Sequence, residues 1–322
     1  PFPPENAGIF KKILSIFAYR KIPGVGGARN LLLFAKLKLG LAGARAGETA
    51  LEFLERHRVG KAAIEVFWEP FCVSALNTSC GLASAELMLS TLRKSVLAGG
   101  ENGILYFPKA AAIDALMPKA AAYLECVGAR IRLSEPVGKI EIRGGKFDNC
   151  VCALPAKALA KMLPENSPFA ARIGKIGTTG IINAYFTTGK KLFDGSYASL
   201  AGSPVHWIFD HTQKSRQCAE SGTFLYGATI SHARIPFDPA EIRGTLGRET
   251  KKYFGECEIL DILPSLFAEA TISADCESES ARPADGECGA QNLHICGDWV
   301  ATGLPCTMES AAKSANDLTI FD

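Results

Sequence analysis

A carboxylate and a glycine loop stand between a strand-like run and a helix-like run near the end of the chain. The apolar run ends at Cys296, Gly297 and Asp298 follow directly, and Gly303 lies in the loop before the helix-like run. A carboxylate beyond the carboxyl end of a strand can accept hydrogen bonds from sugar or ribityl hydroxyls. The free N–H groups and positive dipole end of a helix start suit a phosphate or an electron-rich carbonyl. These residues indicate a ligand site, although a Gly-Asp turn before a helix also occurs as plain structure.

Other nucleotide and hydrolase motifs are absent or incomplete. The run from Gly24 to Arg29 begins like the dinucleotide fingerprint G-x-G-x-x-G, but Arg29 occupies the third glycine position and no apolar strand precedes the run. The sequence contains no G-x-x-x-x-G-K-S/T, no G-x-S-x-G and no H-E-x-x-H. The sequence therefore gives no motif that would indicate P-loop, α/β-hydrolase or zinc-protease chemistry.

The 11 cysteines and 5 histidines do not form a metal-binding pattern. The cysteines lack the paired C-x-x-C spacing of zinc sites, so we expect free thiols and no metal. Cys150 and Cys152 alternate along a predicted strand, which places both on one face in a buried structural role. Alternation also separates His206 and Asp210 from His211, which is a poor geometry for a shared metal.

Composition restricts the class of protein. The chain has 322 residues, of which 48% are hydrophobic and 21% charged, so a disordered chain, a collagen-like repeat and a charged coiled coil are disfavoured. The length fits one large or two medium domains. A net charge of +2 gives no electrostatic case for a nucleic-acid partner. No apolar window is long enough and free enough of charge to predict a membrane-spanning helix.

The beginning of the chain is locally basic and rich in apolar residues. From Pro1 to Gly47 it carries eight basic residues and one acid, Glu5. One interpretation is a surface that rests on anionic lipid. The other is a helical subdomain whose polar face happens to be basic.

Hydrophobic periodicity and turn residues predict the elements that position these groups. The first hundred residues are mostly helical, and β-like runs follow in the middle of the chain. The predicted helices are 49–57, 83–97, 110–127, 239–254 and 307–318. The predicted strands are 104–107, 129–133, 139–143, 147–153, 181–187, 205–210, 223–230, 269–273 and 293–296. This mixture predicts an α/β or α+β fold with two intertwined lobes.

The C-terminal run also carries a resemblance. Gly297-Asp298-Trp299, Thr302-Gly303-Leu304-Pro305 and Thr307-Met308-Glu309 resemble the closing flavin-binding signature of the FAD-dependent amine oxidase and phytoene desaturase superfamily. The residues of these three motifs are most similar to those of the squalene-associated branch, the hydroxysqualene dehydroxylases of hopanoid biosynthesis. Further matches follow in the same order along the chain, at 67–78, 106–128, 207–210, 270–271 and 282–283.

The resemblance implies a fold and a division of the chain. The fold is α/β, mixed with α+β: an FAD/NAD(P)-binding Rossmann-like domain, incomplete at its N-terminus, interleaved with a substrate domain of mixed sheet and helices. The superfamily opens with a strand and G-x-G-x-x-G, which this chain lacks, so we expect residues before Pro1 to supply the pyrophosphate site. The expected parts are a mainly helical substrate- or membrane-facing region (1–100), an FAD-domain segment on the adenine side (101–160), a substrate domain (161–265) and a C-terminal FAD-domain segment (266–322).

The resemblance also implies the site residues. The cofactor is FAD, with Val137 beside the adenine, Asp298 on the ribityl or phosphate side and the following loop near the isoalloxazine. The expected cofactor-binding residues are Val137, Gly297, Asp298, Trp299, Gly303, Leu304, Pro305, Thr307 and Met308. The expected substrate-binding residues are Phe67, Trp68, Phe71 and Asn77, in the wall of an apolar tunnel. No catalytic acid is assigned, because Glu69 near this wall is better explained as a helix-surface carboxylate.

The implied function is an oxidoreductase that removes the allylic hydroxyl of hydroxysqualene and gives squalene, with hydride from reduced flavin. Two alternatives stay open: a carotenoid-type desaturase or amine oxidase of the same superfamily, and a truncated fragment that binds lipid or a partner without catalysis. The expected partner is a hydrophobic isoprenoid, with no metal and no nucleic acid. We expect a cytoplasmic protein with a peripheral contact on the inner face of the cytoplasmic membrane.

Overall fold

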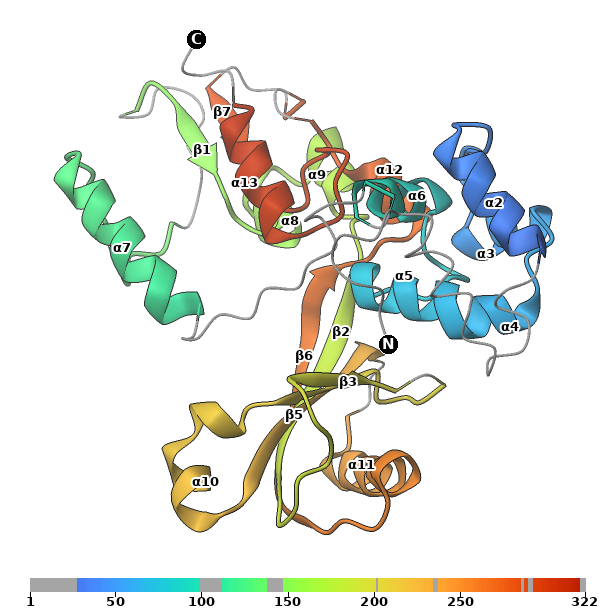
Figure 1. Ribbon diagram of the computed structural model, residues 1–322. Helices are drawn as coiled ribbons and strands as arrows, with labels where there is room; N and C mark the ends of the chain where they lie inside the picture. The colour runs from blue at the N-terminus through green and yellow to red at the C-terminus, as the bar shows by residue number, and fades with distance from the viewer. Residues whose placement is uncertain are drawn as a thin grey trace.

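The computed structural model describes residues 28–95, 97–98, 112–137, 147–200, 202–233, 237–284, 287–288 and 292–318. Three parts are visible in Figure 1: a helical region, a five-stranded sheet, and a third part around the last helix. Each part has its own cluster of buried apolar side chains. The predicted strands at 104–107 and 139–143 lie outside the described residues, as do residues 1–27.

The helical region holds the first cluster. A capping box starts one of its helices, since Thr49 accepts a bond from the Glu52 amide and Glu52 accepts one from the Thr49 amide. Trp68, Phe53 and Met88 are fully buried in its core. Its elements are α2 (Ala28–Lys38), α3 (Ala50–Arg56), α4 (Lys61–Ala63), the π-helical η1 (Ile64–Trp68), α5 (Glu69–Leu76) and α6 (Ala85–Lys94).

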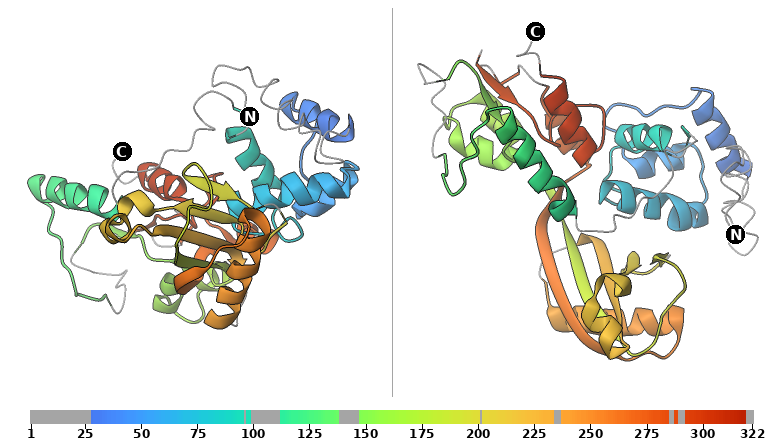
Figure 2. Two further views of the ribbon diagram at one scale, coloured as in Figure 1. Left: turned by 60° about the horizontal axis from the view of Figure 1, so that its bottom comes forward. Right: turned by 60° about the vertical axis from the view of Figure 1, so that its left-hand side comes forward.

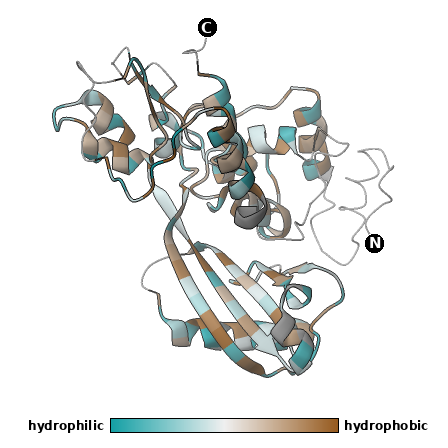
Figure 3. Ribbon diagram, turned by 90° about the vertical axis from the view of Figure 1, so that its left-hand side faces the viewer, coloured by the Kyte–Doolittle hydropathy of each residue, from teal (hydrophilic) through white to brown (hydrophobic). Residues whose placement is uncertain are grey.

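The five-stranded sheet is antiparallel, with strand order β3-β4-β5-β2-β6. Alternation along β2 buries Ile182, Ala184 and Phe186, whereas Tyr185 is exposed. Figure 3 shows this alternation of apolar and polar residues along the strands. The helix α11 (Pro239–Phe254), capped by Asp238, packs Leu246 into the cluster of the sheet. The strands are β2 (Thr178–Thr188), β3 (Tyr197–Ser199), β4 (Trp207–Asp210), β5 (Phe224–Ala233) and β6 (Ile259–Ile272), with η3 (Thr212–Lys214) and α10 (Arg216–Ser221) between β4 and β5.

The third part is built on two short parallel strands. β1 (Cys150–Cys152) pairs with β7 (Leu293–Ile295). Cys152 is buried and Cys150 half-buried while Val151 is exposed, as the predicted alternation requires. Four helices belong to this part: α8 (Ala156–Met162), α9 (Pro168–Ile173), α12 (Cys276–Ala281) and α13 (Met308–Asn316). The strands β2 and β6 run from this part into the five-stranded sheet, as Figures 1 and 2 show.

One helix stands apart from the rest. α7 (Ala112–Cys126) projects to one side in Figure 1 and in the left view of Figure 2. Its described apolar side chains are exposed, with Tyr123 at 68% and Met117 at 54%. None of the described helices is both long and apolar enough to cross a membrane.

The structure differs from the expected elements and boundaries in three places. Residues 129–133, predicted as a strand, form none, because no described strand lies beside them to accept their backbone bonds. α9 packs Phe169 and Ile173 into the cluster around β1 and β7, so this part extends beyond residue 160. β6 stays paired with β2 as far as Ile272, which carries the sheet past residue 265.

Candidate functional site

The turn after β7 is fixed by glycine and by α13. Gly297 has a φ of +145°, and a Cβ there would lie 2.9 Å from Trp299 Nε1, so only glycine fits without strain. The Gly297 amide donates to Ser314 Oγ at 2.8 Å, and the same hydroxyl donates back to the Gly297 carbonyl at 3.1 Å. Asp298 follows, half-buried, and its carboxylate forms no hydrogen bond or ion pair with the described residues. This carboxylate is therefore free to accept bonds from a ligand.

A buried arginine shapes the loop that follows. The Arg282 side chain donates to the carbonyl oxygens of Trp299 (3.3 Å), Val300 (2.6 Å) and Leu304 (3.0 Å). It also donates to Glu279 at 2.9 Å and to the Asp298 carbonyl at 3.3 Å. Because the guanidinium uses its fork of donors on carbonyls, the loop turns these oxygens inward. Arg282 lies in one of the runs that match the superfamily, 282–283, but its sequence context predicts no role for its side chain in this loop.

Gly303 forms the outer part of this loop. Its φ is +71°, and a Cβ there would have no atom within 4 Å, so one side of the backbone is open. Its carbonyl oxygen accepts bonds from Ser90 Oγ and Lys94 Nζ of α6, both at 2.9 Å. The helical region thus holds the loop in place from across the molecule. The sequence carries no local signal for Ser90 or Lys94, which are more than 200 residues away.

The start of α13 faces the same loop. Thr307 is the N-cap, and its hydroxyl accepts a bond from the Ser310 amide at 3.4 Å. The amides of Met308 and Glu309 have no intrahelical acceptor, because they lie in the first turn. The Met308 side chain is 77% exposed, an open apolar surface at the positive end of the helix. Pro305 contributes its carbonyl, which accepts the Thr307 hydroxyl at 3.3 Å.

A cysteine beside Asp298 stays protonated. Burial, and then the Asp298 and Glu279 carboxylates, raise the pKa of the Cys306 thiol to about 12, although Arg282 acts in the opposite direction. The loop therefore presents a neutral thiol near neutral pH.

Together these groups fit one half of a flavin site. Asp298 offers a free carboxylate for hydroxyl groups, Gly303 leaves an open side where a Cβ would stand, and the first turn of α13 offers N–H donors. Within the described residues no group of histidine, cysteine, aspartate or glutamate could hold a metal ion.

Three of the expected cofactor residues do not face the open side of the loop. Trp299 is 1% exposed and its indole N–H donates to the Leu154 carbonyl at 2.9 Å, so its ring packs beneath the loop. Leu304 is also buried. Val137 is 68% exposed and lies in no strand, at the end of a described segment. The structure therefore brings together the residues from Gly297 to Met308, and Val137 is not among them.

The three expected aromatic residues of the substrate wall pack mainly against one another. Trp68 is fully buried, stacks on Phe34 with ring centroids 5.3 Å apart, and donates its indole N–H to Asn30 Oδ1 at 3.1 Å. Phe67 meets Trp68 edge-on at 5.1 Å and stacks on Phe71 at 6.2 Å. Trp68 belongs to the core of the helical region, and the half-buried Phe67 and Phe71 pack against that core. A role of these three residues in the wall of an apolar tunnel stays a prediction.

Asn77 joins the helical region to the sheet. Its amide group donates to Thr179 Oγ1 at 2.9 Å and Thr271 Oγ1 at 2.8 Å, and accepts the His232 amide at 2.5 Å. Asn77 is buried with a φ of +49°, at the C-cap of α5. Because the whole amide is used within the protein, Asn77 positions elements where β2 and β6 enter the sheet.

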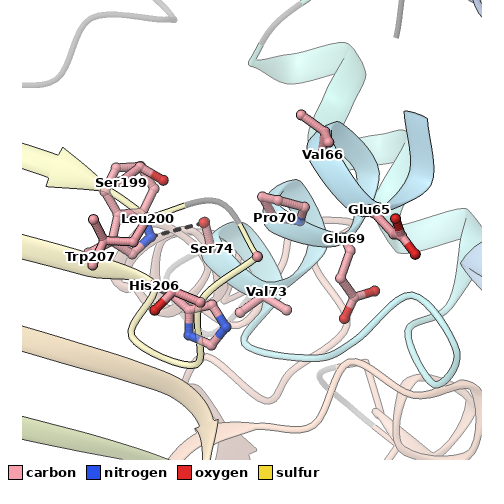
Figure 4. Close-up of a pocket in the computed structure, with 12 residues that line it drawn as sticks. Glu65, Val66, Glu69, Pro70, Val73, Ser74, Ser199, Leu200, His206 and Trp207 are labelled. Carbon is pink, nitrogen blue, oxygen red and sulfur yellow. Dashed lines mark hydrogen bonds between the residues drawn. The ribbon is translucent and has the colours of Figure 1, made fainter. Parts of the chain in front are cut away.

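A pocket of about 140 Å³ lies between α5 and the β3–β4 hairpin (Figure 4). Glu69 lines it, and one oxygen of its carboxylate accepts the Cys80 amide at 2.8 Å. His206 lines it too, and its Nδ1 accepts the Ser231 amide at 3.0 Å, which leaves Nε2 to carry the proton of the neutral ring. Burial lowers the pKa of His206, with His232 acting the same way and Glu69 opposing it. Glu69 is thus more than the surface carboxylate that one reading of the sequence allowed.

Comparison with known proteins also indicates a flavin-binding protein. The family described as flavin containing amine oxidoreductase matches residues 25–317. The chain is similar to a hydroxysqualene dehydroxylase of Sinorhizobium fredii (strain NBRC 101917 / NGR234), with 26% identity over 264 residues that cover 77% of this chain and 59% of the relative. It is also similar to a hydroxysqualene dehydroxylase of Zymomonas mobilis subsp. mobilis (strain ATCC 31821 / ZM4 / CP4), with 24% identity over 267 residues, 76% of this chain and 59% of the relative.

A solved structure of an oxidoreductase from Methanosarcina mazei shares the fold. Its TM-score is 0.62 at 17% identity, over 94% of this chain and 73% of that chain. The expected α/β fold with mixed sheets and helices is therefore confirmed. The chain spans 59% of the length of the curated relatives named above.

Proposed function

Because this chain belongs to the family of flavin containing amine oxidoreductases, we propose that it serves an FAD-dependent reductive dehydroxylation of hydroxysqualene to squalene. One observation carries the choice of substrate: the two curated relatives named above, matched over 77% and 76% of the chain, are hydroxysqualene dehydroxylases. Because the chain spans 59% of the length of these relatives, its activity, its substrate and its partner are all part of the proposal. The product would enter squalene and hopanoid biosynthesis.

The reaction replaces a C–O bond by a C–H bond. It consumes a hydride and a proton and releases the hydroxyl as water. A reduced flavin, when bound, would supply the hydride. The chain's own contribution would be to hold that group: Asp298 would accept bonds from its hydroxyls, and the amides of Met308 and Glu309 would donate to its electron-rich carbonyl.

The pocket beside α5 is the candidate for one end of the substrate. Val66, Val73 and Leu200 give it apolar walls. At about 140 Å³ it lies below the roughly 300 Å³ at which ligand pockets begin, so it would accept only part of a long isoprenoid. The Nε2–H of neutral His206 and a Glu69 oxygen offer a donor and an acceptor to a hydroxyl there.

Turnover of hydroxysqualene tests the proposal. The purified protein is incubated with chemically reduced FAD and hydroxysqualene, and the lipid extract is analysed by gas chromatography with mass spectrometry. Squalene should form only when protein, reduced flavin and substrate are all present. Parallel incubations use a phytoene-type polyene with oxidised FAD, and a primary amine with oxygen. Desaturation of the polyene or oxidation of the amine, with no squalene formed, would replace the proposed reaction by another of the same family.

A further inference from the structure

The helical region carries a second pocket, of about 260 Å³, between α2 and the end of α3. Arg29, Leu32 and Lys36 line it from α2, and their spacing of three and four residues places them on one face of that helix. Arg56 and Arg58 line it from the end of α3. Four cationic side chains thus surround one pocket, and within the described part of the chain no carboxylate lines it.

Three of these cations are not neutralised. Arg56 is paired with Glu48, which accepts its Nε at 2.6 Å and its Nη2 at 2.7 Å. Within the residues that the structure describes, Arg29, Lys36 and Arg58 have no carboxylate partner. An unoccupied cluster of this kind repels its own members, so an anion in the pocket would relieve that repulsion.

The positive charges around the pocket also affect a histidine that lines it. His57 lines the pocket beside Arg56, and its ring packs on Phe53 at 4.6 Å. Burial lowers the pKa of His57, and the charges of Arg56 and Lys36 lower it further, against the opposing Glu48. His57 is therefore neutral near neutral pH and can donate one hydrogen bond without adding charge.

The backbone at Arg58 adds an independent observation. α3 ends in a Schellman motif, in which the Arg58 amide donates to the Glu55 carbonyl at 2.7 Å and the Val59 amide donates to the Leu54 carbonyl at 2.9 Å. Arg58 occupies the left-handed position of this motif, with a φ of +56°. Glycine is the residue that this position favours, because a side chain there is strained.

The neighbouring helix α2 has glycine, the usual residue, at the left-handed position of its C-terminal motif. α2 ends in the same motif, with the Gly40 amide donating to the Leu37 carbonyl at 3.2 Å and the Leu41 amide donating to the Lys36 carbonyl at 2.8 Å. Gly40 takes the left-handed position there, with a φ of +69°. An arginine kept at the equivalent position of α3 points to a use for its side chain at the pocket, since the fold itself would prefer glycine.

Exposed leucines on the pocket wall and just after α2 favour a lipid as the source of the anion. Leu32, on the wall, is 54% exposed, and Leu39 and Leu41, just after α2, are 71% and 72% exposed. Leu39 follows Lys36 by three residues, in the turn directly after the last residue of α2, Lys38. A dissolved phosphate compound would make no use of these side chains, whereas a lipid bilayer would bury them beside its headgroups.

We propose that this pocket binds the phosphate of an anionic phospholipid, so that the face formed by α2 and the end of α3 docks on a membrane surface. Arg29, Lys36 and Arg58 contact the headgroup, and Leu32, Leu39 and Leu41 enter the interface. The proposal is independent of the proposed chemistry, because docking requires neither flavin nor isoprenoid.

Vesicle flotation tests the proposal with the full chain. Vesicles of phosphatidylcholine alone are compared with vesicles that also contain phosphatidylglycerol. The protein should float with the anionic vesicles and not with the neutral ones. Arg58→Gly should weaken this binding about fivefold, the value of one interfacial charge. Arg29→Gln with Lys36→Gln should weaken it further, and Leu39→Ser with Leu41→Ser should weaken it without changing the charge.

The control variants separate binding from folding. Arg58→Gly should leave the melting temperature unchanged or raise it, because glycine suits the left-handed position. Arg58→Lys keeps the charge and should keep the binding. Lys61→Gln removes a cation from the same region whose side chain is 90% exposed and lies outside the pocket, and it should change nothing.

Three results would overturn the proposal. Equal flotation with neutral vesicles would remove the need for an anion. Equal flotation of the Arg58→Gly and wild-type proteins would place the contact elsewhere in the chain. Saturable binding of inorganic phosphate that is lost in Arg58→Gly, without flotation, would identify a site for a dissolved phosphate compound.

Discussion

At the scale of single residues, Arg282 carries the loop that forms the candidate flavin site. Its side chain is fully buried and donates to four backbone carbonyls between Asp298 and Leu304 as well as to Glu279. Replacing it with alanine leaves those acceptors and the carboxylate without a partner. We expect Arg282→Ala to lower the free energy of unfolding by about 3 kcal/mol, as the loss of one member of a buried ion pair does. Urea unfolding followed by circular dichroism measures the change.

A surface arginine is the matched control. Arg248 is exposed, and among the described residues its side chain donates only to Thr245. Arg248→Ala should therefore change stability by no more than about 0.5 kcal/mol. A similar small effect at Arg282 would show that the loop does not depend on it.

Glu48 makes the helical region sensitive to acid. Hydrogen bonds from Arg56 lower the pKa of this carboxyl from 4.5 to about 2, against the opposing effect of burial. A pKa depressed by folding stabilises the folded state above the unfolded pKa. This stabilisation is complete above pH 4.5 and is lost as the pH falls towards 2. In Glu48→Gln the melting temperature should start lower at pH 7 and should fall less between pH 4.5 and 2 than in the wild type. Parallel curves for the two proteins would contradict this assignment.

At the scale of elements, two glycines in one loop should respond differently to the same substitution. A methyl group at Gly297 would lie 2.9 Å from the Trp299 ring, at a φ of +145°. Gly297→Ala should therefore cost about 2 kcal/mol of stability. A methyl group at Gly303 meets no atom within 4 Å, so its cost is limited to about 1 kcal/mol for the left-handed backbone.

The second substitution places its methyl group on the open side of the loop. Gly303→Ala should therefore weaken flavin binding more than it lowers the stability of the fold. Gly297→Ala should lower the stability of the fold more than it weakens flavin binding. Thermal unfolding and flavin titration of both variants measure the two effects. Identical profiles for the two variants would show that the open side of Gly303 does not face the cofactor.

These elements also show which features of the fold and the site could be predicted from the sequence. The Gly-Asp turn, the capping threonine and the helix after them were predictable, because local residue types decide strand ends and helix starts. α11 was predicted at its observed bounds, Pro239–Phe254, for the same reason. The contacts of Lys94 with Gly303 and of Asn77 with Thr271 were not predictable, since they join residues 209 and 194 positions apart. Trp68 is fully buried in the core, which its residue type alone could not decide, because an aromatic residue suits a core and a cavity wall alike.

At the scale of the whole molecule, Asn77 links the helical region to the strands that connect the other two parts. Its amide bonds to Thr179 on β2, Thr271 on β6 and the His232 backbone on β5. Asn77→Gly keeps the left-handed backbone at the end of α5 and removes all of these bonds. We expect faster amide hydrogen exchange at the entry of β2 and β6, with the core of α6 unchanged. Uniform protection in the variant would show that the parts are joined by other contacts.

The central claim is that the residues from Gly297 to Met308 hold a flavin. The most direct measurement is a titration of the purified protein with FAD, followed by the quenching of flavin fluorescence. Three proteins are compared: the wild type, Asp298→Asn, and Asp194→Asn, whose carboxylate is 99% exposed in the loop between β2 and β3. The account predicts saturable binding in the wild type and Asp194→Asn, and binding about tenfold weaker in Asp298→Asn, the value of a charge-assisted hydrogen bond. Absence of saturable binding, or equal affinity in all three proteins, would contradict it.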